Sequence, residues 1–266
     1  MPDWRSYDAV AETYERVHAP KLAEPARHLV RAAALSPGER VLDAGTGTGV
    51  AAAEAAAALG DPSAVIGVDG SVGMLAVGRR VRPHLRSVAA LVIDLPFRDA
   101  TFDAVIGNFV LAHFTKYETA LHDLVRVLRP GGRLALSAWA DGRDELTAAW
   151  LEHVWSVVPR EVLEAALADA IPWRERFRRP EALVEAFLDT GLRQVRVERH
   201  GYRFRYPLED YVEGLGTWAT GRFVRSMLGD ARWSSLLARV REDFGRRFAD
   251  PVLDLREVLI AVGTKP

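Results

Sequence analysis

The chain of 266 residues contains no cysteine, which excludes disulfide bonds, thiolate metal sites and a cysteine nucleophile. An excess of charge of one sign is also missing, because 35 basic residues balance 36 acidic residues to a net charge of −1. A nucleic-acid-binding surface, which is strongly basic, is therefore not expected. No apolar run is long enough to span a membrane, and no secretory signal pattern is present. The composition predicts a cytoplasmic protein without nucleic-acid or membrane partners, and leaves its oligomeric state open.

Hydrophobic residues make up 49% of the chain, which is ample for the core of a large domain. Strand patterns alternate with helical patterns, and this alternation predicts an α/β fold with a doubly wound, mostly parallel sheet. The residues at 115–118 match a capping box and predict the start of a helix there. Strands are predicted at 40–43, 64–69, 88–92, 102–108, 133–139, 194–206 and 256–264, and helices at 8–18, 25–35, 144–168, 182–189 and 208–248, the last with breaks near Gly221 and Asp230.

The most informative segment is the glycine-rich stretch at 41–50. Apolar residues lead to Asp43, glycines follow at alternate positions from Gly45 to Gly49, and an alanine-rich helix pattern comes next. Glycine lets the backbone adopt positive φ and approach a ligand closely, and the helix start offers free N–H groups. A dinucleotide-binding turn would read G-x-G-x-x-G, and Val50 stands where that motif needs its third glycine. The segment predicts a ligand-binding loop between a strand and a helix.

A second acid supports a nucleoside ligand. The predicted strand at 64–69 ends at Asp69, about 20 residues past the glycine turn, which is a position suited to accept hydrogen bonds from two ribose hydroxyls. This spacing suits NAD and S-adenosylmethionine equally, so it indicates a nucleoside without naming it.

Asp-x-Gly-x-Gly-x-Gly at 43–49 resembles motif I of the class I S-adenosylmethionine-dependent methyltransferases. Leu-Pro-Phe at 95–97, Phe-Asp-Ala-Val at 102–105 and Leu-Arg-Pro-Gly-Gly at 128–132 follow in the expected order. They resemble the small-molecule branch of ubiquinone, menaquinone and natural-product methyltransferases, over about residues 7–140. The resemblance implies a Rossmann-like, seven-stranded sheet in which the last strand is antiparallel and inserted beside the sixth.

The resemblance also implies a domain organisation. It comprises an N-terminal helical cap at 1–38, a cofactor-binding α/β core at 39–140, a helical lid insertion at 141–180, and a remainder at 181–266 that completes the sheet and carries a second helical insertion at about 208–250. Both insertions leave the sheet at the carboxyl ends of strands, where open α/β sheets bind ligands. We therefore expect them to cover the cofactor pocket.

The implied cofactor is S-adenosylmethionine. In the family, Met74 would lie against the adenine, the Asn108 backbone carbonyl would take the amino group, and Tyr14 would reach the methionine carboxylate or the substrate; packing on the sheet is an equal alternative for Tyr14. The residues expected at the cofactor are Tyr14, Asp43, Gly45, Thr46, Gly47, Asp69, Gly70, Met74, Leu91, Val92 and Asn108.

The chain departs from the family at the adenine. An acid is usual four residues before the Leu-Pro-Phe leucine, and Leu91 stands there instead. Either the Val92 amide and apolar packing hold the adenine, or Asp94 does so in a shifted register. We favour the first alternative, because Asp94 falls in a loop where an acid commonly serves turn geometry.

Candidate residues for the reaction lie near the carboxyl ends of the strands. Methyl transfer is an in-line displacement, which needs a base only when the acceptor must lose a proton. His113 is the best-placed histidine for a base or substrate contact, with local packing as the alternative; His18 and Trp139 are expected in the substrate pocket. Asp141, Asp144 and Glu145 occupy the position of a magnesium site in catechol-type enzymes, but Asn108 replaces the partner acid, so no metal is expected.

The sequence thus predicts a methyltransferase acting on a small, apolar or aromatic metabolite, with O-methylation favoured over C- or N-methylation. One alternative is a natural-product enzyme that binds S-adenosylmethionine and catalyses a non-methylating cyclisation or rearrangement. The other is an NAD-dependent oxidoreductase, against which Val50 argues.

Overall fold

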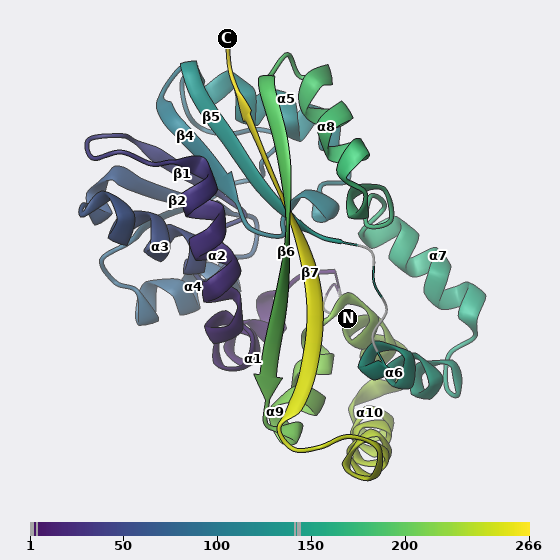
Figure 1. Cartoon of the computed structure of the whole chain (residues 1–266). Helices are drawn as coiled ribbons and strands as arrows, with labels where there is room; N and C mark the ends of the chain where they lie inside the picture. The colour runs from purple at the N-terminus through teal and green to yellow at the C-terminus, as the bar shows by residue number, and fades with distance from the viewer. Residues whose placement is uncertain (1–2, 4, 141, 143–144) are drawn as a thin grey trace.

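The computed structural model describes residues 3, 5–140, 142 and 145–266 (Figure 1). These residues form a seven-stranded sheet in the order β3-β2-β1-β4-β5-β7-β6. β7 runs antiparallel between β5 and β6, and the other pairings are parallel. The α/β fold class and the antiparallel last strand are therefore confirmed. The strands are β1 Val41–Ala44, β2 Val65–Asp69, β3 Arg86–Ala89, β4 Phe102–Gly107, β5 Leu128–Trp139, β6 Arg193–Tyr206 and β7 Val252–Thr264.

Helices cover both faces of the sheet. α2 and α3 pack on one face together with Val41 and Ile106, whereas α5 and α8 pack on the other face with Leu42 and Val105. All four residues of β1 are buried, as expected for a central parallel strand that has helices on both sides. The α-helices are α1 Ala11–Val17, α2 Ala19–Ala33, α3 Val50–Leu59, α4 Val72–Val81, α5 Tyr117–Val127, α6 Glu145–Trp155, α7 Arg160–Ala170, α8 Pro180–Asp189, α9 Leu208–Gly214 and α10 Ala219–Arg247.

A group of helices gathers at the carboxyl end of the sheet. In Figure 1, α1, α6, α9 and α10 lie around the end at which β6 terminates. α10 packs against α6, α7 and α9, while α1 packs against α4 and α9. Segments from the two ends of the chain therefore meet over the strand ends. None of the helices in the described residues is long and apolar enough to cross a membrane.

Several predicted boundaries were wrong. β3 ends at Ala89, so the apolar residues that follow belong to a loop and not to the edge strand. α5 begins at Tyr117 without a side-chain cap, so the predicted capping box does not form. The Thr115 carbonyl accepts a hydrogen bond from the Trp173 indole at 3.2 Å. The long helix predicted at 144–168 is divided into α6 and α7.

The helix predicted at 208–248 is interrupted at Trp218, close to the break predicted near Gly221, and again at Gly229, beside Asp230. Leu215–Thr217 form a short 3-10 helix, η5, before α10 begins at Ala219. Gly221 lies inside α10, where an added Cβ would come 1.9 Å from the Leu215 carbonyl oxygen. This glycine serves close packing between the two helices. Gly229, at φ +73°, interrupts α10 beside Asp230.

Candidate functional site

The glycine-rich loop joins β1 to α3 in a conformation that requires glycine. Gly45 and Gly47 have φ values of +67° and +56°, where a side chain causes strain. A Cβ on Gly45 would also lie 2.2 Å from Val110 Cγ2, on the segment that follows β4. The Thr46 amide donates to the Val68 carbonyl at 2.9 Å. The loop is thereby fixed between the ends of β2 and β4.

Asp43 and Thr46 lie beneath this loop. Asp43 has no accessible surface, and one of its carboxylate oxygens accepts a hydrogen bond from Thr46 Oγ1 at 2.7 Å. Burial raises the pKa of Asp43 to about 7, against the opposing effect of the Thr46 hydrogen bond. The Thr46 side chain packs against Gly67 of β2. We therefore propose that both side chains support the loop from below, whereas the sequence analysis expected them to contact the ligand directly.

Asp69 is held at the carboxyl end of β2, opposite the loop. Its Oδ2 accepts from the Gly47 amide and its Oδ1 from the Ser71 amide, both at 2.8 Å. Burial raises the pKa of Asp69, although these backbone hydrogen bonds act in the opposite direction. Carboxylate oxygens have further lone pairs, so the fixed side chain can still accept hydrogen bonds from a diol. This geometry suits a carboxylate that accepts hydrogen bonds from the two ribose hydroxyls.

The start of α4 and the loop after β3 border the same region. Met74 is buried, and its Cε lies 3.2 Å from the position of a Cβ on Gly47. Leu91 is 61% exposed, and its Cδ2 lies 3.2 Å from the position of a Cβ on Gly70. The backbone of Val92 carries an amide that donates to no acceptor among the described residues. Apolar side chains and a free amide are therefore available for a flat heterocycle.

The N-terminal segment docks on this region through a residue that the sequence analysis missed. Asp8 Oδ1 accepts hydrogen bonds from Ser71 Oγ at 2.6 Å and from the Gly73 amide at 2.7 Å. These donors lower the pKa of Asp8. A Cβ on Gly73 would lie 2.6 Å from Asp8 Cα, so the absence of a side chain permits the contact. No local pattern signals a pairing between segments so distant in the sequence.

Tyr14 lies on α1 among aromatic rings. Its ring centroid is 6.1 Å from that of Tyr7 and 5.7 Å from that of His18. Burial raises its pKa, and the negative charge of Asp69 contributes in the same direction. The Tyr14 hydroxyl therefore stays protonated and can donate a hydrogen bond towards the Asp69 side of the site.

His113 ends the short 3-10 helix η3, Leu111–His113, that follows β4. Its ring makes an edge contact with Tyr7 at 5.8 Å between centroids. Although the side chain keeps a solvent-accessible face, protein surrounds it closely enough that desolvation, assisted by the positive charge of Arg222, lowers its pKa to about 4. The imidazole is therefore neutral at physiological pH.

His18 is more enclosed than expected for a substrate contact. Only 8% of its surface is accessible, and its Nε2 lies 2.8 Å from Thr217 Oγ1 and 3.3 Å from the Gly214 carbonyl. Burial lowers its pKa to about 4. This placement ties the end of α1 to η5 and favours a structural role in holding the helices together.

Trp139 presents an aromatic surface at the end of β5. It stacks on Phe109 with centroids 4.0 Å apart and planes at 13°, and it contacts Phe204 edge-on at 6.5 Å. Trp139 remains 38% exposed. Phe109 holds a left-handed φ of +60°, and its amide donates to Ser137 Oγ, which donates in turn to Asn108 Oδ1 at 2.7 Å. The pair supplies a flat apolar wall beside the ends of β4 and β5.

The expected absence of a metal rests on residues that are only partly described. Asp141 and Asp144 lie outside the described residues, and Glu145 is the exposed first residue of α6. Among the residues that can be described, no group of three or more histidine or carboxylate side chains is arranged to hold a metal ion.

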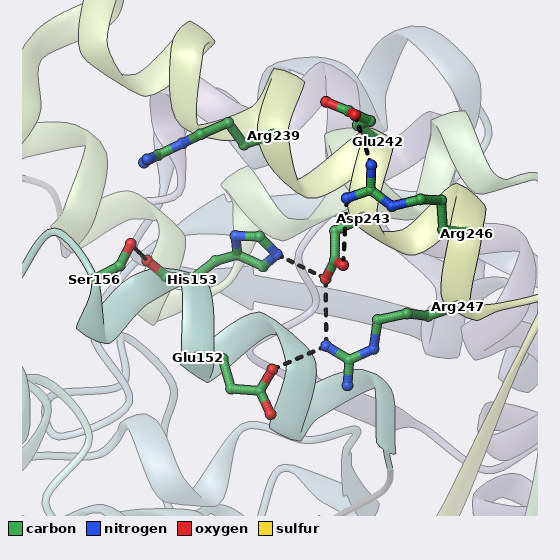
Figure 2. A pocket seen from close by; sticks show the side chains of 8 residues that line it. All are labelled: Glu152, His153, Ser156, Arg239, Glu242, Asp243, Arg246 and Arg247. Atoms are coloured by element: carbon green, nitrogen blue, oxygen red, sulfur yellow. Dashed lines mark hydrogen bonds and ion pairs between the residues drawn. The ribbon is translucent and has the colours of Figure 1, made fainter.

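A surface cavity of about 450 Å³ lies elsewhere, between α6 and α10 (Figure 2). Asp243 accepts hydrogen bonds there from His153 at 3.0 Å and from Arg247 at 3.3 Å, and Arg247 also pairs with Glu152. None of the residues predicted for cofactor or substrate lines this cavity. Its charged groups largely neutralise one another, so it is not the candidate site. The lining residues are Glu152, His153, Ser156, Arg239, Glu242, Asp243, Arg246 and Arg247.

Comparison with known proteins gives consistent results. A family profile described as "Methyltransferase domain" matches residues 42–136. The demethylmenaquinone methyltransferase of Beutenbergia cavernae is 43% identical over 104 residues, which cover 39% of this chain and 42% of the relative. That of Mycobacterium sp. (strain KMS) is 33% identical over 159 residues, covering 58% of this chain and 67% of the relative. The matches thus span only part of these relatives.

Solved structures share the fold at low sequence identity. The phosphoethanolamine N-methyltransferase 2 of Haemonchus contortus, solved in complex with S-adenosyl-L-methionine, superposes with a TM-score of 0.57 at 18% identity. The superposition covers 97% of this chain and 57% of that one. The likeness therefore extends over nearly all of the present chain, including the helices outside the matched domain.

Proposed function

Since this chain belongs to the class I S-adenosylmethionine-dependent methyltransferases, we propose that it transfers a methyl group from S-adenosylmethionine to a small aromatic acceptor bearing a hydroxyl group. The stacked pair of Phe109 and Trp139 beside the strand ends carries the proposal for the acceptor, because exposed aromatic faces stabilise flat apolar ligands by stacking. The names of the relatives point to the same class, since demethylmenaquinone is a quinone-type acceptor.

The residues present fit this cofactor, which supplies an electrophilic methyl group when bound. Gly45 and Gly47 leave space that a Cβ would fill, so the backbone can approach the amino acid moiety and the ribose. We assign the ribose hydroxyls to the fixed carboxylate of Asp69, the adenine to Met74 and the Val92 amide, and the amino acid end to Tyr14. The Asn108 carbonyl and the apolar contacts of Gly70 and Leu91 complete the proposed set.

We assign the rate enhancement mainly to positioning. An oriented nucleophile gains much of its rate from the geometry in which it is held, and the helices over the strand ends would restrict both acceptor movement and water access. His113, with its pKa near 4, is a poorly matched base for a phenol, whose pKa is about 10. Within this arrangement its neutral ring orients the acceptor and does not take the proton.

The proposal is tested by the mass of the product. We expect purified protein with S-adenosylmethionine and a panel of phenols, naphthols and hydroquinones to yield a product heavier by one CH₂ group. O-methylation, which we favour, removes the titratable hydroxyl, whereas C-methylation preserves it, and proton NMR separates the two. Turnover of an acceptor to a product of unchanged mass would refute methyl transfer and support a rearrangement or cyclisation.

A prediction for His113 follows from its low pKa. The group is neutral above about pH 4, so we expect no inflection in turnover near pH 6.5, where an unperturbed histidine titrates. His113→Ala should lower turnover less than 10-fold, because a positioned general base typically contributes 100- to 10,000-fold. Steady-state kinetics between pH 5.5 and 9 provide the measurement. A loss above 100-fold with unchanged S-adenosylhomocysteine affinity would instead identify His113 as the base.

A second prediction tests the adenine register. Asp94 is exposed, so Asp94→Asn should change S-adenosylhomocysteine affinity by less than about 0.5 kcal/mol, the usual range for a surface substitution. Isothermal titration calorimetry measures this directly. An affinity loss of 10-fold or more would show that Asp94, and not the Val92 amide, holds the adenine.

A further inference from the structure

The turn after β4 holds an aromatic residue in an unfavourable backbone conformation. Phe109 has a φ of +60°, in the left-handed region that glycine adopts freely and bulky residues rarely adopt. The other non-glycine residues with positive φ in the described part of the chain are Ala34, Ala100 and Gln194, none of which is aromatic. Residues in such conformations persist only where their surroundings hold them, and they concentrate at functional sites.

β5 holds Phe109 at two points. The Phe109 ring stacks on Trp139 with centroids 4.0 Å apart, and the Phe109 amide donates to Ser137 Oγ at 2.9 Å. Ser137 and Trp139 are two residues apart on one strand, so their side chains point to the same face of the sheet. Only 1% of the Ser137 surface is accessible, which shields its hydrogen bonds from water. One strand therefore fixes both the ring and the backbone of Phe109.

Ser137 also controls the direction of the carbonyl that precedes Phe109. The Asn108 carbonyl and the Phe109 amide belong to one planar trans peptide group, so the hydrogen bond from this amide to Ser137 directs the carbonyl away from Ser137. The Ser137 hydroxyl donates in turn to Asn108 Oδ1 at 2.7 Å, which uses its one donor. The Asn108 carbonyl accepts no hydrogen bond within the part of the chain that the structure describes, so it is available to a ligand.

The same turn borders the glycine-rich loop. The Val110 side chain occupies the space that a Cβ on Gly45 would need. Gly107, at the end of β4, has no side chain to separate the two segments, and a Cβ there would lie 3.2 Å from the Ala44 carbonyl oxygen. The peptide group held by Ser137 therefore follows directly from a backbone that is packed against the proposed cofactor loop.

We propose that Ser137 is a positioning residue that aims the Asn108 carbonyl at the amino group of the bound cofactor. The inference rests on the proposed function, in which this carbonyl takes that amino group. Phe109 has to be aromatic to form the wall for the acceptor, but an aromatic side chain disfavours the backbone conformation that presents the carbonyl. The two hydrogen bonds of Ser137 offset this cost, so that one turn serves the cofactor and the acceptor together.

The test compares S-adenosylhomocysteine with 5′-methylthioadenosine, which keeps the nucleoside and the sulfur but lacks the amino acid end. Isothermal titration calorimetry gives both affinities for each variant. Ser137→Ala should weaken S-adenosylhomocysteine binding by about 10-fold, as expected when a hydrogen bond to a charged group is lost, and should leave 5′-methylthioadenosine binding nearly unchanged. A general loss of structure would weaken both ligands, so the ratio of the two affinities reports on the amino acid end alone.

Two further variants test the role of the turn. Glycine adopts positive φ without strain, so adding Phe109→Gly to Ser137→Ala should recover most of the lost S-adenosylhomocysteine affinity. Tyr202→Phe is the matched control, because it removes a hydroxyl from another buried side chain of the sheet, where that hydroxyl lies 2.7 Å from His28 Nδ1. The affinity ratio of Tyr202→Phe should equal that of wild type.

The possible failures can be told apart. Wild-type protein that binds neither ligand would overturn the proposed function. Equal weakening of both ligands by Ser137→Ala, or an unchanged ratio in the variant when circular dichroism shows it folded, would overturn only the role of Ser137, as would a combined variant that recovers no affinity. If Ser137→Ala does not fold, Ser137→Cys replaces it, since a thiol is close in size to a hydroxyl but hydrogen-bonds weakly. An unchanged ratio in that variant would likewise refute the role of Ser137.

Discussion

Replacing Asp69 by alanine should weaken S-adenosylhomocysteine binding by on the order of 100-fold. A charge-assisted hydrogen bond contributes roughly 1.5–3 kcal/mol, and we assign both ribose hydroxyls to this side chain. The carboxylate also accepts the amides of Gly47 and Ser71, so its removal loosens the loop that surrounds the ligand. Calorimetric titration with S-adenosylhomocysteine at neutral pH measures the loss.

Asp69→Asn is the companion variant. Its amide oxygen can replace one acceptor, so we expect a smaller loss than for alanine. Circular dichroism and urea unfolding should show that both variants keep the fold, because the side chain lies at the end of β2 and not within its core. Native-like affinity in a folded Asp69→Ala protein would show that the ribose is bound elsewhere.

Gly45→Ala should destabilise the protein by about 2–4 kcal/mol. The substitution adds strain at a φ of +67°, which costs of order 1–3 kcal/mol. It also places a Cβ 2.2 Å from Val110 Cγ2, and overpacking of this kind typically costs a further 1–3 kcal/mol. Relief by small movements of the loop brings the total below the sum. Urea unfolding of wild type and variant gives the difference.

Gly60 offers a matched control for Gly45. It ends α3 with a similar φ of +69°, but no atom lies within 4 Å of its Cβ position. Gly60→Ala should therefore show the backbone cost alone, at about 1 kcal/mol. Val110→Ala combined with Gly45→Ala should recover part of the additional loss, as a double-mutant cycle would detect. Equal destabilisation by Gly45→Ala and Gly60→Ala would rule out the contact with Val110 as the cause.

Local sequence was sufficient to predict the α/β sheet and the glycine-rich loop that follows its first strand. The alternation of apolar strands with helices depends on short-range periodicity, and the glycines at alternate positions from Gly45 to Gly49 are needed wherever a backbone must turn at positive φ. The position of Asp69 beside the glycine-rich loop could also be predicted, because parallel strands place their carboxyl ends at the same edge of the sheet. The boundary of β3 was missed because this edge strand is mostly exposed, and no side-chain cap forms at the start of α5 although the local pattern matches one.

Only the tertiary structure decided which side chains meet over the strand ends. Asp8 reaches the start of α4 and Arg222 reaches Tyr7 only because helices from both ends of the chain pack over the same strand ends. Packing also sets the chemistry of His113, because desolvation lowers its pKa to about 4. A sequence specifies which residues can ionise, but their charge state in the fold depends on how much water the packed chain removes from around them.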